Sequence, residues 1–504
     1  MEEPRVSVGI MSAPTIQFDL IGQFEVTNTC PNGADFKQTT VEGIQEVTLI
    51  DGKISWSHSS LVESICFVPK DEEKCCFELK EVTIGVDFHW QRKENQRFKG
   101  ALELIVEGEK LTAVNHVRVE DYLTSVISSE MSANASLELL KAHAVISRSW
   151  LLASMNCIAK NYPELISHPE QYRTTLTQHT GDGEVLTAKM HIHDTKELAN
   201  RKNGYDADQE EQQQKSNCKE MMKWYERDAH TRFDVCADDH CQRYQGITRA
   251  SRETVRQAIA ATRGEVLTYE GSICDARFSK CCGGAFEEFE YCWDDIHYPY
   301  LSKKSDLSDT SAQHTPLPDL TQESEAEQWI RSAPDAFCHT TDKEILSQVL
   351  NNYDQETTDF YRWKVSYTQD ELRELIRKRS GVDYGEIADL VPIARGTSGR
   401  LWKLKIVGTK NSCIIGKELE IRRTLSPSHL YSSAFVVDKE GCRCAEPNSS
   451  GISQVPERFI LTGAGWGHGV GLCQIGAAVM GAKGYPYDAI LRHYFAGADL
   501  TTLY

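Results

Sequence analysis

The residues best suited to chemistry first appear in the stretch 118–157. Glu130 follows an apolar helical stripe and stands beside Met131. On the next predicted helix, Lys141 and Arg148 lie seven residues apart, which places them on one face. A carboxyl group in a partly apolar wall near fixed cations suits general acid–base catalysis. A surface glutamate on an ordinary helical hairpin has the same pattern, and spacing alone leaves both interpretations open.

A second group, His230, Cys236, His240 and Cys241, falls within twelve positions. Thiolate and imidazole are the usual zinc donors, and two of each make a closed tetrahedral set. The spacing is not that of a zinc finger, and buried thiols beside surface histidines would give the same pattern. If all four bind one ion, no coordination position remains for water. The set therefore favours a structural zinc over a zinc hydrolase.

A third candidate is a loop in which five of the nine residues 463–471 are glycine. Glycines at this density prevent regular structure and let the backbone approach a ligand closely. His468 lies inside the loop and Gln474 lies just beyond it. A dinucleotide-binding interpretation fails, because no strand–helix–strand unit surrounds these glycines.

The elements that position Glu130 are two predicted helices joined by the polar residues 132–136. Ser136 is a suitable N-cap for the second helix. A β-hairpin over 98–117 leads into the first helix, and another over 266–279 follows the His/Cys set.

The later part of the chain mixes helical and β patterns. Thr368 followed by Glu371 predicts a capping box at the start of one helix. Two short helices are expected on either side of Gly484. The predicted helices cover 324–333, 343–353 and 368–381, and the predicted strands cover 387–396, 399–409 and 418–426. A polar segment, 303–327, is predicted to be a surface loop or linker.

Composition excludes several classes of protein. The chain of 504 residues carries 55 Lys and Arg against 74 Asp and Glu, a net charge of −19. This balance argues against non-specific nucleic-acid binding and against docking on an anionic membrane. The sequence contains no run of 18 apolar residues, so no membrane span is predicted.

Two further features concern the compartment. The start, MEEPRVSVGIM, lacks the basic and apolar regions of a secretory signal. We therefore expect a cytoplasmic protein as the sequence is written, or a cell-envelope protein if it is a mature form. The 17 cysteines are odd in number and include two adjacent pairs, which favours a reducing compartment.

Two long motifs resemble the stage II sporulation protein D family, which includes the amidase enhancers called LytB. The run EDYLTSVISSEM and then LKAHAVISRSW resembles the family's EDYL-x-GVV-xx-EMP and LKAQAVAARTYA, with Ser125, Ser132 and His143 as departures. The run GWGHGVGLCQIGA resembles its GWGHGVGMSQYGA, with Leu472 and Cys473 among the departures.

The resemblance implies a peptidoglycan lytic transglycosylase that cleaves denuded glycan strands, with Glu130 as the general acid. It implies that Lys141, Arg148, His468 and Gln474 bind substrate, and that the His/Cys set binds zinc, as a similar set does in some members. The alternative is a non-catalytic glycan-binding amidase enhancer that activates a partner cell-wall amidase.

The predicted fold class is α+β. We expect an N-terminal β-rich domain over 1–98 and a SpoIID/LytB-like mixed helix and sheet unit over 99–504. Two insertions are expected within that unit, at about 158–228 and 303–358.

Overall fold

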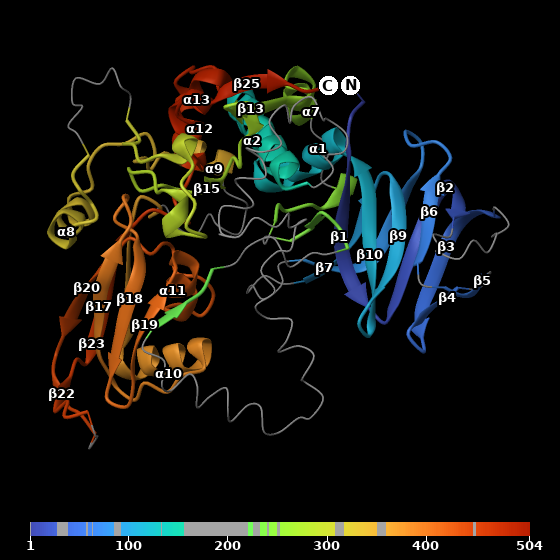
Figure 1. Ribbon diagram of the computed structural model, residues 1–504. Coiled ribbons are helices and arrows are strands. Elements are labelled where there is room, and N and C mark those ends of the chain that lie inside the picture. The colour runs from blue at the N-terminus through green and yellow to red at the C-terminus, as the bar shows by residue number, and fades with distance from the viewer. Residues whose placement is uncertain are drawn as a thin grey trace, which may run out of the picture.

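The computed structural model describes residues 2–27, 39–56, 59–62, 64–84, 92–132, 134–155, 220–224, 232–238, 241–248, 253–307, 317–349, 359–446 and 450–504. The fold is α+β, as predicted. Figure 1 shows a large N-terminal sheet, a group of helices next to it, and a second unit of strands and helices from the later part of the chain. Both chain ends lie near the helical group.

The largest sheet has eleven strands. They are β1 (Arg5–Ala13), β2 (Thr15–Thr27), β3 (Thr39–Ile50), β4 (Lys53–Trp56), β5 (Ser59–Val62), β6 (Ser64–Pro69), β7 (Cys76–Ile84), β8 (Arg92–Phe98), β9 (Ala101–Glu107), β10 (Lys110–Arg118) and β12 (Val235–Cys236). In β2, Ile16, Phe18 and Leu20 alternate toward the core, the pattern of a half-buried strand. The boundary expected at residue 98 falls inside this sheet, because β9 and β10 continue it and β10 pairs with β1.

The helical group lies at the end of β10. Helices α1 (Val119–Glu130) and α2 (Leu137–Ser154) confirm the predicted pair, and Ser136 caps α2 by accepting a hydrogen bond from Leu139 N at 3.3 Å. One hydrophobic core joins the large sheet, these helices and the C-terminal segment. The other elements here are η3 (Gly246–Thr248), α7 (Glu253–Ala261), β13 (Glu265–Tyr269), β14 (Ser272–Ile273), α12 (Gln474–Ala482), α13 (Tyr487–Tyr494) and β25 (Asp499–Thr502).

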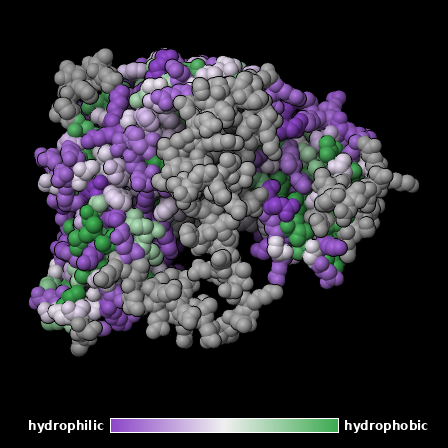
Figure 2. Space-filling view, in the orientation of Figure 1, coloured by the Kyte–Doolittle hydropathy of each residue, from purple (hydrophilic) through white to green (hydrophobic). Residues whose placement is uncertain are grey.

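The second unit has its own core. Its sheets contain β16 (Arg362–Thr368), β20 (Phe435–Glu440) and β23 (Arg458–Ala464), then β11 (Glu220–Met222), β17 (Ile387–Arg395), β18 (Leu401–Gly408) and β19 (Ser412–Gly416), and the short pair β21 (Arg443–Cys444) and β22 (Gln454–Val455). Helix α10 (Gln369–Ser380) starts with the predicted capping box. Ile393 on β17 is 45% exposed, and Figure 2 shows apolar surface over this unit.

One element of this unit differs from its prediction. Residues 418–426 were expected to be β, but they form helix α11 (Glu418–Thr424). Ile421 and Leu425 are four residues apart and both are buried, which is helical spacing. Glu418 and Arg422 add an ion pair of 3.3 Å one turn apart. The short apolar pattern fitted either structure, and packing decided it.

Shorter elements connect the two units. These are β15 (Phe278–Ser279), η4 (Phe289–Tyr291), η5 (Pro299–Leu301), α8 (Glu323–Ser332), α9 (Lys343–Val349) and β24 (Leu472–Cys473), with β15 parallel to β24. The segment 303–327 was expected to cross the surface, yet Asp306 within it is fully buried. Among the described residues, no helix is long and apolar enough to cross a membrane. The structure describes fourteen of the cysteines, and it shows no disulfide bond between any two of them.

Candidate functional site

Glu130 is the last residue of α1, and its side chain is partly exposed. Strand β10 leads directly into this helix, whose buried residues Val119, Leu123 and Val126 hold it against the core. Glu130 Oε1 accepts a hydrogen bond from Arg243 N at 3.3 Å. A carboxyl group at the end of a fixed helix, only partly withdrawn from solvent, is well placed for proton transfer.

The ring of Tyr122 brings Glu130 and the His/Cys segment together. This buried ring stacks on Tyr244 with centroids 5.0 Å apart. Burial raises the pKa of the Tyr122 phenol well above its usual value. The thiols of Cys241 and Cys236 and the carboxyl group of Glu130 raise it further. The first motif and the His/Cys segment therefore lie next to each other: Tyr122 OH donates to Gln242 Oε1 at 3.3 Å, and Arg243 N donates to Glu130.

Of the four zinc ligands expected, Cys236 and Cys241 lie in the described part of the chain. Cys241 Sγ accepts a hydrogen bond from Cys236 N at 3.5 Å. Strand β12, which carries Cys236, is held in the large sheet by parallel pairing with β1. His230 and His240 lie outside the described residues, so the complete set stays a prediction.

The two cations of α2 occupy different surroundings from those expected. Lys141 Nζ pairs with Glu138 Oε1 at 2.8 Å. Arg148 is fully buried and forms a bidentate pair with Glu120, at 3.0 and 2.6 Å. Its third hydrogen bond goes to Glu265 O at 2.9 Å. The structure therefore places Arg148 in the interior, because the helix face that carries it packs inward, and its contact with substrate stays a prediction.

Gln474 also lies inside the protein rather than at a surface. Its side chain is 2% exposed, and its amide nitrogen lies 3.1 Å from His143 Nε2. His143 Nδ1 in turn lies 3.2 Å from Ser147 Oγ. Burial lowers the pKa of His143 from 6.5 to about 3, and the charge of Lys280 contributes. This contact joins the two sequence motifs, and the substrate-binding role of Gln474 stays a prediction.

The glycine-rich loop encloses a side chain of the protein itself. Arg400 is buried, and its Nε donates to Gly467 O at 3.0 Å. A Cβ on Gly469, where φ is +78°, would lie 2.5 Å from the Arg400 guanidinium carbon. A Cβ on Gly471, at φ +71°, would lie 2.1 Å from Arg277 O. The glycines are needed for these close approaches, which involve no ligand.

His468 lies in this loop with its side chain half-buried. Its Nδ1 accepts a hydrogen bond from Val470 N at 3.0 Å, and its ring meets Trp293 edge-to-face at 4.9 Å. Burial lowers the pKa of His468 well below its usual value, with added repulsion from Arg277. The imidazole is therefore neutral near pH 7. Within the described contacts, nothing joins His468 to Glu130.

A second carboxylate, not predicted from the sequence, lies near the glycine-rich loop. Glu287 is fully buried and accepts hydrogen bonds from Ser398 Oγ at 2.7 Å and Thr397 Oγ1 at 3.0 Å. Burial raises its pKa. No motif in the sequence marks this residue. Because it is enclosed, Glu287 anchors the loop of Thr397 and Ser398 and is not placed to reach a substrate.

A buried cluster that could hold a metal ion was also not predicted from the sequence. Cys282, Asp306, Cys338 and Cys473 come from four separate segments, and their ligand atoms all lie within 4.8 Å of one another. Only their contact in the folded chain reveals them, because their sequence spacing matches no metal-binding motif.

Two families match parts of this chain. Residues 107–269 match the family described as stage II sporulation protein, and residues 287–471 match a domain of unknown function, DUF8618. The first match contains α1, α2 and the His/Cys segment. The second contains Glu287, Arg400 and His468.

Two curated relatives were found. An uncharacterised protein of Brachyspira hyodysenteriae is 23% identical over 403 residues, which is 80% of this chain and 72% of that protein. The amidase enhancer of Bacillus subtilis is 27% identical over 264 residues, 49% of this chain and 32% of the enhancer. The similarity to the enhancer thus spans about a third of its length.

Proposed function

Because this chain is a member of the SpoIID/LytB family, we propose that it is a peptidoglycan lytic transglycosylase. A role at the cell wall is supported by the match to the sporulation protein family and by the amidase enhancer among the relatives. The observation that carries the proposal is the position of Glu130 at the end of α1, partly exposed and bonded to the backbone of Arg243.

The substrate would be a glycan strand of alternating N-acetylglucosamine and N-acetylmuramic acid, stripped of stem peptides. Protonated Glu130 donates its proton to the glycosidic oxygen as the bond from that oxygen to C1 breaks. The carboxylate then removes the proton of the sugar's own 6-hydroxyl, whose oxygen forms the new bond to C1. No water is consumed, and the second carboxylate of an ordinary glycosidase is not required.

We further propose that His230, Cys236, His240 and Cys241 bind one structural zinc beside this acid. The support is the contact of Cys236 N with Cys241 Sγ and the hydrogen bond from Arg243 N, two residues after Cys241, to Glu130. A filled site of this kind stabilises folding and performs no chemistry. Purified protein should contain this zinc, and Cys236→Ser should lose it.

A second candidate function is that of a non-catalytic amidase enhancer, which binds denuded glycan and activates a cell-wall amidase. The observation that favours it is the name of the Bacillus subtilis relative. On this view the partly exposed end of α1 would contact glycan without donating a proton.

One experiment separates the two functions. The purified full chain is incubated with stem-stripped glycan, in one series alone and in another with a cell-wall amidase acting on intact peptidoglycan. The proposed transglycosylase shortens glycan strands without amidase. If strands stay intact and only amidase activity rises, the enhancer function is correct.

A further inference from the structure

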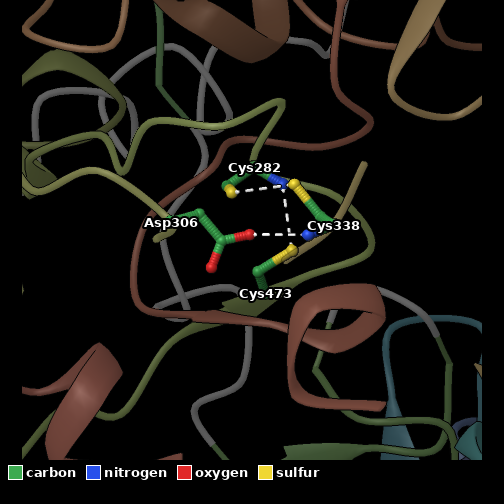
Figure 3. Close-up of side chains that lie close together, drawn as sticks. All are labelled: Cys282, Asp306, Cys338 and Cys473. Atoms are coloured by element: carbon green, nitrogen blue, oxygen red, sulfur yellow. Dashed lines mark hydrogen bonds between the residues drawn. The ribbon is translucent and has the colours of Figure 1, made fainter. Parts of the chain in front are cut away.

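Three thiols and one carboxylate meet in the interior beside β15 and β24. Cys282 lies just after β15, Asp306 and Cys338 lie on either side of α8, and Cys473 ends β24. All four are buried, and Figure 3 shows their sulfur and oxygen atoms turned toward one another. We propose that Cys282, Asp306, Cys338 and Cys473 bind one zinc ion at a closed structural site.

The spacing of the ligand atoms fits a single ion. The sulfur atoms of Cys282 and Cys338 lie 3.5 Å apart. A disulfide bond is about 2.05 Å long, so these two thiols are not bonded to each other. Zinc–sulfur bonds of about 2.3 Å place neighbouring sulfurs of a tetrahedron about 3.8 Å apart. All four ligand atoms fall within 4.8 Å, so small movements would close the site around zinc.

A second layer of hydrogen bonds holds the proposed ligands. Asp306 Oδ1 accepts from Tyr494 OH at 3.0 Å and lies 3.3 Å from His493 Nε2. Its Oδ2 accepts from Cys338 N at 3.0 Å. Cys473 Sγ accepts from Cys282 N at 3.2 Å, one of the contacts drawn in Figure 3. Metal sites have such outer partners, because they fix the direction of each ligand.

The backbone around the cluster leaves room for this arrangement. A Cβ on Gly476 would lie 2.8 Å from Asp306 Oδ2 and 2.3 Å from Tyr494 OH. Glycine at this position therefore lets the first turn of α12 approach the carboxylate. The N–H of Gly476 also points at Cys473 Sγ, 3.5 Å away.

Charge gives a further reason for a cation. The carboxylate of Asp306 is fully buried, and its described hydrogen bonds come from a phenol, an imidazole and a backbone amide. A buried carboxylate beside several thiols is unfavourable unless it takes up a proton or positive charge compensates it. His493 can supply one positive charge at most, whereas zinc supplies two and favours thiolate ligands.

The proposed ion would join segments that lie far apart in the sequence. Cys473 is next to Gln474, whose side chain contacts His143 on α2. Zinc at the cluster would therefore fix the end of the glycine-rich loop relative to α2. This site is separate from the set at His230, Cys236, His240 and Cys241, and it does not depend on the proposed enzymatic activity.

The test is the zinc content of the full chain, purified without chelators, in wild type and four variants. Cys338→Ser and Cys473→Ser should each lose about one zinc per chain. Cys274→Ser, which changes a buried thiol outside the cluster, should lose none. Cys236→Ser should keep the ion at Cys282, Asp306, Cys338 and Cys473, whether or not it loses the zinc proposed at the His/Cys set. The proposal is overturned if Cys338→Ser and Cys473→Ser retain the wild-type zinc content.

A second measurement covers variants that fail to fold. X-ray absorption at the zinc edge of Cys236→Ser should show a first shell of about three sulfur atoms and one oxygen. Wild-type protein that is purified folded and zinc-free without chelators, or mass analysis of unreduced wild type showing a Cys282–Cys338 disulfide, would overturn the proposal.

Discussion

Glu120 and Glu130, at the two ends of helix α1, are carboxylates whose surroundings are opposite. Glu120, in the first turn, is 9% exposed and accepts hydrogen bonds from Arg148, Gly264 N and Tyr504 OH. Glu130, the last residue, is partly exposed and accepts a described hydrogen bond from Arg243 N alone. A carboxylate whose oxygens all accept hydrogen bonds from the protein stabilises the fold. A carboxylate with few hydrogen-bond partners can still exchange its proton with a substrate.

The helix itself adds to this difference. The positive end of the helix dipole lies near Glu120 and favours its negative charge, whereas the negative end lies near Glu130. The start of α1 is therefore the better place for an ion pair.

The largest effect should come from replacing Glu130. Glu130→Gln keeps the size of the side chain and removes the acid, so glycan cleavage should fall by about 10²–10⁴-fold. Its melting temperature should stay near that of the wild type, because only one hydrogen bond is described for Glu130. Glycan binding should survive, since the amide fills the same space. Mass analysis over time measures cleavage, sedimentation measures glycan binding, and calorimetry measures the melting temperature.

Glu120→Gln is the matched control on the same helix. It should lower the melting temperature, because it leaves the buried guanidinium of Arg148 without its counter-charge. If Glu130→Gln lowered stability and Glu120→Gln lowered activity alone, the assignment of the two carboxylates would be reversed.

The second largest effect should come from Arg148. Removing one partner of a buried ion pair destabilises a protein by about 3–5 kcal/mol, so Arg148→Ala should unfold at much lower temperature. The double variant Glu120→Gln/Arg148→Met should recover part of that loss, because no charge remains buried. Urea unfolding of the three proteins checks the order. If Arg148→Ala kept full stability but cleaved glycan more slowly, Arg148 would instead be a substrate-binding residue.

The charged residues of α1 and α2 show which features could be predicted from the sequence. The helices, the Ser136 cap and the Glu130 position followed from local patterns, which a sequence displays directly. The sequence placed Lys141 and Arg148 on one face but could not tell which neighbours cover that face. Arg148 meets Glu120 only because α1 and α2 fold against each other, and that contact is long-range.

The same limit applies to sites built from separate segments. Asp306 stands in a polar stretch that is typical of a surface linker, yet the fold buries it against Cys282, Cys338 and Cys473. The glycine-rich loop was recognisable as irregular, but the guanidinium of Arg400 that it encloses was not. Propensity and spacing describe neighbours along the chain and not across the core.

A third effect is a pH dependence of stability at the contact between the two motifs. Burial lowers the pKa of His143 to about 3, below its unfolded value of 6.5. The unfolded chain therefore binds the extra proton first, and stability contributed by neutral His143 is present above pH 6.5 and is lost as pH falls toward 3. The loss is on the order of a few kcal/mol at most.

His143→Gln isolates this contribution, because the amide can still meet Gln474 and has no proton to gain. The variant should lose less stability than the wild type between pH 6.5 and about pH 4, as measured by urea unfolding. Equal losses in both proteins would show that His143 is not buried in its neutral form.

The smallest effect should come from Lys141. Its pair with Glu138, three residues away on one helix, is part-buried, and such helix pairs contribute about 0.2–0.5 kcal/mol. Lys141→Met should therefore change stability little, and cleavage should change by less than about 10-fold, below the range expected of an acid or base. A loss of glycan affinity without a loss of stability would show that Lys141 binds substrate after all.

The product of the wild-type protein tests the central claim most directly. Purified full chain is incubated with stem-stripped glycan, and the fragments are analysed by mass. If Glu130 acts as acid and then as base toward the sugar's own hydroxyl, each new end is a 1,6-anhydro sugar, one water lighter than a reducing end. Reducing ends would mean that water attacks and that a second carboxylate takes part. Uncut strands would mean that the protein binds glycan without cleaving it.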